Sequence, residues 1–283
     1  MAEGWHPTRG TGTSVAGYVT PTFHERLCVY VHPPFTHEVR PRAGRWIGVS
    51  AWPPTDGSAG PIKCATFRLS AGDNGLVRCT RDSHDDAVWG VWGAEGDHAA
   101  SAVDGVSVRS EWATRVISTD TCMAGGHGGE WLSYGGPDLA GDQRMDDAQC
   151  LTWDSPPLDA DYAVRSTGSR RVVVCGRCDQ SPCRVCHDAP CAFQIVGFPV
   201  LRCIVRSSQP VAQLAVRLCQ VFPDGTSAQV TRGLLNLTHR HGHGTDAVAA
   251  MPVDTPCAVT VRLNAVAHTV PTGCRIRVAV SPL

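Results

Sequence analysis

Lysine and glutamate are almost absent from this sequence of 283 residues. Lys63 is the single lysine among 25 basic residues, and six of the 26 acidic residues are glutamate. Both residue types favour the exposed faces of helices, so their scarcity argues against a helical bundle, a coiled coil and a helical repeat array. Glycine and proline, in contrast, number 29 and 20, which favours a chain with many turns.

The sequence also lacks an excess of charge of one sign and long apolar runs. The formal net charge is -1, which gives no electrostatic reason to expect nucleic acid or an anionic membrane as a partner. No apolar run approaches the roughly 18 residues of a membrane-spanning helix. Residues 1–20 are rich in glycine and threonine, unlike a secretory signal peptide. We therefore expect a location in the cytoplasm, without a nucleic-acid or membrane partner.

Short apolar stretches separated by turn residues predict β-strands along most of the chain. Turns are predicted at 223–226 and 271–273 from their proline, aspartate and glycine residues. The predicted strands cover 27–31, 46–49, 64–69, 150–153, 212–221, 227–237, 258–267 and 275–280. Many short strands without a helical period indicate an all-β sandwich.

Five of the 14 cysteines lie close together, and the other nine are spread singly, as small apolar residues are. We expect reduced thiols, because nothing in the sequence suggests secretion. The clustered cysteines are Cys175, Cys178, Cys183, Cys186 and Cys191. Two C-x-x-C pairs occur in this cluster, but only four residues separate them, whereas zinc sites usually have about 15–20. Cys175, Cys178, Cys183 and Cys186 are thus weak candidate metal ligands, and 183–187 also fits a haem attachment string.

Serine and histidine patterns give no firm catalytic site. The nearest matches to a nucleophile elbow are 12–16, which lacks a preceding strand, and 48–52, where Trp52 is too large for the tight turn. We therefore expect no catalytic residues and no cofactor. His239, His241 and His243 have a spacing that invites a metal site, but we interpret them as structural or loop histidines. Asn236 begins a glycosylation sequon that we expect to be unused.

Several motifs occur in one order along the chain and together resemble a known family. They cover residues 24–158 and 193–283 and are found at 44–46, 52–53, 129–131, 136–147, 213–225, 233–240 and 273–281. The segment 141–147, with the sequence Gly-Asp-Gln-Arg-Met-Asp-Asp, is one of the upstream motifs and is similar to part of the family's central loop. The chain resembles the C-terminal domain of the cocaine-esterase (CocE/NonD) and X-Pro dipeptidyl-peptidase family of serine hydrolases.

The resemblance implies a jelly-roll β-sandwich of the galactose-binding-like kind, over residues 24–283, after a flexible lead-in at 1–23. Family members pass directly between two strands where this chain has 159–192, which we interpret as a Cys-rich insertion. The resemblance also implies that catalysis belongs to an α/β-hydrolase domain, which carries the serine, aspartate and histidine and does not fit into 1–23. We expect this chain to be inactive alone, and to pair with such a domain or to self-associate.

Two further functions remain open at this stage. A stand-alone sandwich often binds glycans or proteins, and Trp89, Trp92 and Trp112 are candidate contacts if they are exposed rather than packed in the core. The second alternative is a zinc-binding protein that uses the cysteine cluster.

Overall fold

The computed structural model describes residues 27–31, 45–49, 67–70, 73–78, 103–108, 114–118, 124–128, 141–158 and 193–282. These residues form antiparallel β-sheets, and the two helical elements among them are single turns, α2 (Arg144–Asp147) and η1 (Leu237–His239). The prediction of an all-β sandwich is confirmed. The jelly-roll connectivity stays a prediction.

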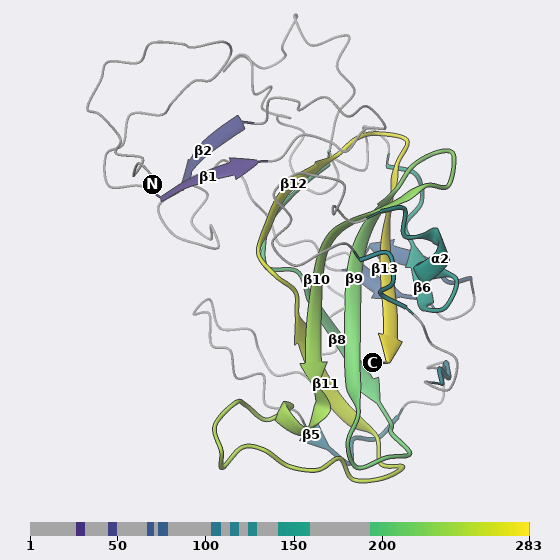
Figure 1. Cartoon of the computed structure of the whole chain (residues 1–283), viewed down its shortest axis with the longest axis vertical. Helices are drawn as coiled ribbons and strands as arrows, with labels where there is room; N and C mark the ends of the chain where they lie inside the picture. Colours follow the sequence, from purple (N-terminus) through teal and green to yellow (C-terminus); the bar gives the residue numbers. More distant parts are fainter. Residues whose placement is uncertain are drawn as a thin grey trace, which may run out of the picture.

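The first layer is a four-stranded sheet (Figure 1). It contains β6 (Leu151–Asp154), β9 (Gln213–Val221), β10 (Ser227–Asn236) and β13 (Arg275–Pro282). The spatial order is β10-β9-β13-β6, with every neighbouring pair antiparallel. The strand from the end of the described chain therefore lies inside the sheet, between two strands that precede it in the sequence.

The second layer lies behind the first in Figure 1 and consists of two short sheets. In one sheet β11 (Cys257–Arg262) pairs with β8 (Val200–Val205) and with β5 (Val103–Asp104). In the other, β12 (Val266–Val270) pairs with β7 (Phe193–Gly197). Since β7 runs on into β8 and β11 runs on into β12, the two short sheets form one interrupted antiparallel pair.

Two hairpin-like pairs complete the described elements. In one pair, β3 (Phe67–Leu69) is antiparallel to β4 (Leu76–Arg78). This pair joins the first layer through a parallel bridge between Gly75 and Asp154. In the other pair, β1 (Leu27–Val31) is antiparallel to β2 (Arg45–Val49).

The core lies between the two layers, and its buried side chains come from both. Val216, Leu218 and Val280 belong to the first layer, and Val259 and Val270 to the second. Successive side chains of a strand point to opposite faces. On β9, the residues between those that face the core therefore face the other side of the sheet, where α2 lies (Figure 1).

The predicted strand 258–267 is wrong as a single strand, because the structure divides it into β11 and β12. The partner strand is interrupted at the same level by Pro199, which has no N–H to donate. The backbone N–H groups of Leu263 and Asn264 bind the carbonyl oxygens of Pro199 and Arg232, at 2.9 Å each. Here the second layer bends toward β10, so the segment 263–265 forms a corner between the layers.

Both predicted turns are present. Gly225 and Gly273 have left-handed φ angles of 87° and 83°, which glycine adopts without strain. The predicted lead-in 1–23 and insertion 159–192 lie outside the described residues. In the part of the chain that the structure describes, no helix has the length and apolar character to cross a membrane. The cytoplasmic location stays a prediction.

Candidate functional site

The most densely connected polar cluster lies on the outer face of the first layer, under α2. We call it the arginine cluster and define it as Arg217, Arg277, Asp146, Asp147 and Asp154. Arg217 Nη2 lies 3.0 Å from Asp147 Oδ1, and Nη1 lies 3.4 Å from Asp146 Oδ2. All three side chains are at least nine-tenths buried. A buried carboxylate is tolerated only when it is paired and hydrogen-bonded, which these contacts provide.

Arg277 extends the arginine cluster from β13 to β6. Its Nε and Nη2 each lie 2.6 Å from a carboxylate oxygen of Asp154, and its Nη1 lies 3.0 Å from Asp147 Oδ2. The paired contact with Asp154 matches the fork of a guanidinium to a carboxylate and raises the pKa of Arg277 above its ordinary value. Asp147 therefore bridges both arginines and attaches α2 to the sheet.

The motif 141–147 supplies the short helix α2 and its anchors. Gln143 is fully buried: its Nε2 donates to the carbonyl oxygens of His127 (2.6 Å) and Gly141 (2.8 Å), and its Oε1 accepts from Arg217. Gln143, Asp146 and Asp147 of this motif thus attach the segment to the sheet through Arg217. Their partner, Arg217, was not predicted from the sequence. Its charge within the otherwise apolar segment of β9 was a signal that it has a buried partner.

His127 is held by the same cluster. Its backbone N–H donates to Asp146 Oδ2 at 3.1 Å, and its ring Nδ1 lies 3.2 Å from Asp146 Oδ1. The ring itself is half exposed. Two other histidines have carbonyl or carboxylate partners: His241 Nε2 lies 3.4 Å from Asp104 Oδ2, and His268 Nε2 lies 3.0 Å from Gln220 Oε1. None of these three contacts is part of a Ser-His-Asp arrangement.

A second ionic contact, between Arg240 and Asp104, lies at the end of the sandwich that contains β5. Arg240, which is buried, donates to both carboxylate oxygens of Asp104, at 2.8 and 2.6 Å. It also donates to the carbonyl oxygens of Leu237, Ala249 and Ala250, at 3.1, 2.7 and 3.1 Å. We call this contact the arginine clamp. The hydrogen bonds from Arg240 lower the pKa of Asp104 well below its ordinary value.

The sequon residue Asn236 has a structural role in the same region. Its Oδ1 accepts from the backbone N–H and the hydroxyl of Thr238, at 3.1 and 2.9 Å, and so caps η1.

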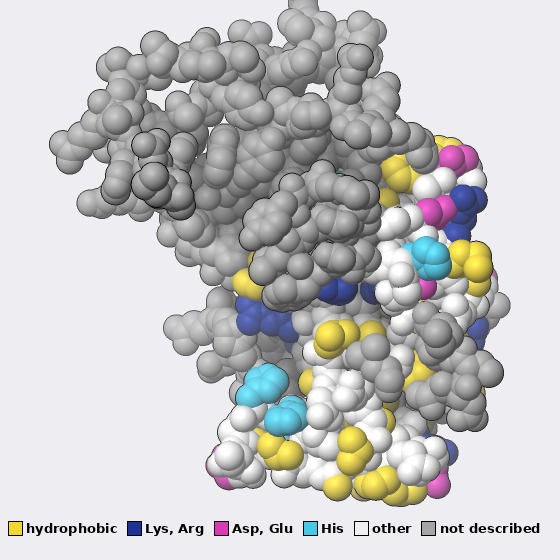
Figure 2. All heavy atoms as spheres, in the orientation of Figure 1, with side chains coloured by type: hydrophobic (Ala, Val, Ile, Leu, Met, Phe, Trp, Pro, Cys, Tyr) yellow, Lys and Arg dark blue, Asp and Glu magenta, His cyan; other side chains and the backbone are white. Residues whose placement is uncertain are grey.

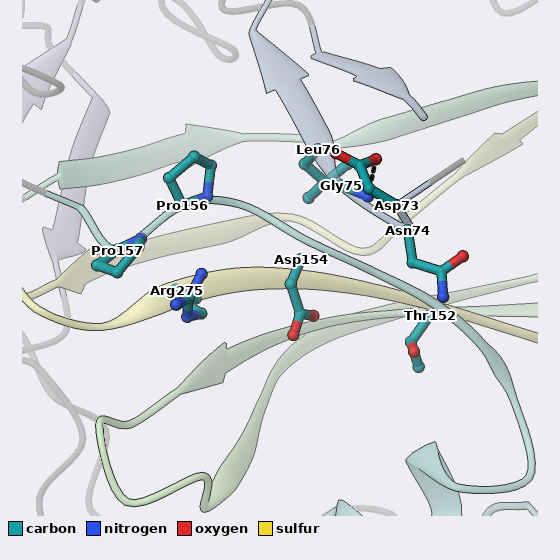
Figure 3. A pocket seen from close by; sticks show the side chains of 9 residues that line it. All are labelled: Asp73, Asn74, Gly75, Leu76, Thr152, Asp154, Pro156, Pro157 and Arg275. Atoms are coloured by element: carbon teal, nitrogen blue, oxygen red, sulfur yellow. Dashed lines mark hydrogen bonds between the residues drawn. The ribbon is translucent and has the colours of Figure 1, made fainter. Parts of the chain in front are cut away.

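An open hollow of about 480 Å³ lies beside β6. Figure 3 shows Asp73 and Asn74 at one side and Asp154 and Arg275 across from them. Asp154 already pairs with Arg277, and Arg275 Nη1 donates to the Ser155 carbonyl oxygen at 2.9 Å. The lining that the structure describes contains no aromatic ring, in contrast to most small-molecule pockets. The hollow therefore gives little support for a ligand site.

The described cysteines are free thiols, as predicted. Burial raises the pKa of Cys203 and Cys219 to about 12, so both stay protonated and unreactive at neutral pH. The candidate ligands Cys175, Cys178, Cys183 and Cys186 lie outside the described residues, as do Trp89, Trp92 and Trp112. Among the described residues, no group of three or more His, Cys, Asp and Glu side chains is placed to hold a metal ion.

The comparison with protein-family models gives a match over the last part of the chain. Residues 179–282 match the family model described as the X-Pro dipeptidyl-peptidase C-terminal non-catalytic domain. The match begins inside the predicted insertion 159–192, which the structure does not describe. A comparison with curated proteins gives no match.

Several solved structures are similar to this chain at low identity. A CocE/NonD family hydrolase from Staphylococcus aureus is 13% identical, with a TM-score of 0.45 over 93% of this chain and 34% of that one. An aminopeptidase from a marine sediment Thaumarchaeota archaeon is 18% identical, with a TM-score of 0.46 over 84% and 31%. An α-amino acid ester hydrolase is 20% identical, with a TM-score of 0.37 over 50% and 20%. The chain thus spans about a third or less of each of these proteins.

The fold defines the class of the described part of this chain as an antiparallel β-sandwich. Residues 179–282 are similar to the X-Pro dipeptidyl-peptidase C-terminal domain. The resemblance found in the sequence is therefore confirmed.

Proposed function

We propose that this chain is the accessory sandwich of a CocE/NonD-type serine hydrolase and that it acts on acyl esters or X-Pro peptides only together with an α/β-hydrolase domain. The match of residues 179–282 to a non-catalytic domain model carries this proposal. The polar contacts of the described residues support it, because they tie strands and loops together instead of placing a nucleophile beside a base.

The proposed role is to support the substrate cleft of the partner domain. A rigid sandwich suits this role, since the arginine cluster fixes the outer face of one layer and the arginine clamp fixes one end. We further propose a jelly-roll connectivity for the sandwich. In the absence of its partner domain, the chain self-associates through the surface left uncovered.

The first test is the activity of the purified chain alone. We expect no turnover of p-nitrophenyl acetate or of glycyl-prolyl p-nitroanilide, because catalysis needs a serine nucleophile and a base that the proposal assigns to another domain. Turnover that a serine-directed inhibitor abolishes would show that this chain carries its own active site.

The second test supplies the missing half. The α/β-hydrolase part of a CocE/NonD hydrolase, expressed without its own sandwich, is mixed with this chain and assayed with the same substrates. We expect the chain to raise the activity and to elute with that part in size-exclusion chromatography. An unrelated β-sandwich of similar size is the control, and an equal effect from it would contradict a specific pairing. A glycan array provides the counter-test, since selective sugar binding would favour the stand-alone binding module.

A further inference from the structure

The loop after β10 carries three histidines within five residues, His239, His241 and His243. It lies at the end of the sandwich near β5, where Figure 2 shows exposed histidine side chains. The loop starts from a fixed base, because the arginine clamp binds Leu237 and Ala249 and because the N–H of Gly242 donates to the His239 carbonyl oxygen at 3.0 Å. Beyond this base, Gly242 has a φ of 143°, a conformation that glycine tolerates.

Two of the three imidazoles face each other. The ring centroids of His239 and His243 lie 5.7 Å apart, with 30° between the ring planes. His241 differs, because its Nε2 lies near Asp104 Oδ2 at 3.4 Å. The Asp104 carboxylate is in turn bound by Arg240 through both oxygens. The arginine clamp thus keeps the third histidine away from the other two.

One nitrogen of this pair lacks a partner. His239 Nδ1 is buried and makes no hydrogen bond to any described residue. A buried polar atom without a partner is unfavourable and calls for an explanation, of which a bound ion is one. His243, in contrast, is exposed, so its ring is free to adjust toward a ligand that reaches the pair from solvent.

We propose that His239 and His243 together bind one divalent transition-metal ion, Ni²⁺, Cu²⁺ or Zn²⁺, with water in the remaining positions. Imidazole nitrogen suits these ions. Two nitrogens at about 2.1 Å from one tetrahedral ion lie roughly 3.4 Å apart. Rings with centroids 5.7 Å apart reach this spacing when their nitrogen-bearing edges turn toward each other.

The site has two protein ligands, in keeping with the lack of any group of three potential ligands among the described residues. It assigns a ligand role to His239 and His243, beyond the structural or loop role expected from the sequence. It also differs from the proposed function, since no step of ester or peptide hydrolysis uses it.

The test is nickel binding by isothermal titration calorimetry on untagged protein. The background carries C175S, C178S, C183S, C186S and C191S, so that the thiols of the cysteine cluster do not contribute. We expect one bound Ni²⁺ per chain. We expect H239A and H243A each to weaken binding at least about 10-fold, because losing even a residue that only supports a metal ligand weakens binding by about that factor. H241A and H127A are matched controls, for which we expect unchanged affinity.

Folding is checked by the thermal midpoint of each variant, and H239Q and H243Q replace the alanine variants if those unfold. In the parent protein we expect Ni²⁺ to raise the midpoint, because an ion that binds only the folded state stabilises it, and this rise should disappear in H243A. Parent-like affinity in H239A or H243A, or no binding by the parent, would overturn the proposal.

Discussion

The guanidinium of Arg240 binds both carboxylate oxygens of Asp104, although 136 residues separate the two in the chain. This contact joins β5, the loop after β10 and the segment 249–250. It also explains how the short strand β5 stays beside β11, although only two residue pairs join these strands.

Replacing Arg240 should therefore destabilise the protein markedly. Arg240→Ala removes five hydrogen bonds and leaves three backbone carbonyl groups and the Asp104 carboxylate without that donor. We expect a loss of about 2–3 kcal/mol in the free energy of unfolding, measured by urea denaturation. Arg144→Ala is the control, since Arg144 pairs with Asp142 at the surface, and it should cost under about 1 kcal/mol. Equal effects of the two variants would contradict a special role for the arginine clamp.

The same carboxylate predicts a pH dependence. Arg240 lowers the pKa of Asp104 from its ordinary value of 3.8. A group whose pKa is lower in the folded state adds stability above its unfolded pKa and loses it as the pH falls. The stability difference between the wild type and Asp104→Asn should thus be constant near neutral pH and shrink below about pH 4. Urea midpoints from neutral to acid pH measure this difference. A difference that does not change with pH would show that the charge of Asp104 contributes nothing.

The arginine cluster predicts strong coupling between Arg217 and Asp147. Arg217→Ala leaves two carboxylates buried without that partner, and we expect a cost of about 3–5 kcal/mol. Arg217→Met with Asp147→Asn removes both charges and should cost less than Arg217→Ala alone. A double-mutant cycle with the single variants measures the coupling energy. Strictly additive effects would contradict a direct ion pair.

Gly233 on β10 allows the close approach of the two layers at the corner formed by 263–265, and its replacement tests this approach. A Cβ at this position would meet the Arg262 carbonyl oxygen at 2.5 Å and Leu263 Cα at 2.9 Å, both of them backbone atoms that cannot swing away. Gly233→Ala should lower stability by about 1–3 kcal/mol. Gly141→Ala is the matched control, because its Cβ would meet nothing within 4 Å. The thermal midpoints of the two variants measure the difference. A midpoint of Gly233→Ala equal to that of the wild type would mean that the layers are farther apart than in the structure.

The strands were largely predictable, because alternation and turn chemistry are local signals. The predicted 212–221 and 227–237 correspond to β9 and β10 within a residue, and 27–31 matches β1. The division of 258–267 was not predictable, since its cause is the distant Pro199 and the close approach of Gly233.

The polar contacts were predictable only in part. The strand pattern placed Arg217 among apolar neighbours, which signals a buried partner, but it did not reveal that the partners are Asp146 and Asp147, 70 or more residues earlier. The contact between the rings of His239 and His243 depends on the path of the loop backbone. The spacing of the two residues in the sequence does not predict that path. The cysteine cluster, 175–191, lies outside the described residues.

The central place of β13 has a consequence for the order of folding. Neither β9 nor β6 can complete its hydrogen bonds until residues 275–282 are present, because β13 lies between them. During synthesis the first layer must therefore wait for almost all of this sequence to leave the ribosome. Contacts between such distant segments also slow the search for the native state, and the edges of the unpaired strands are open to aggregation in the interval.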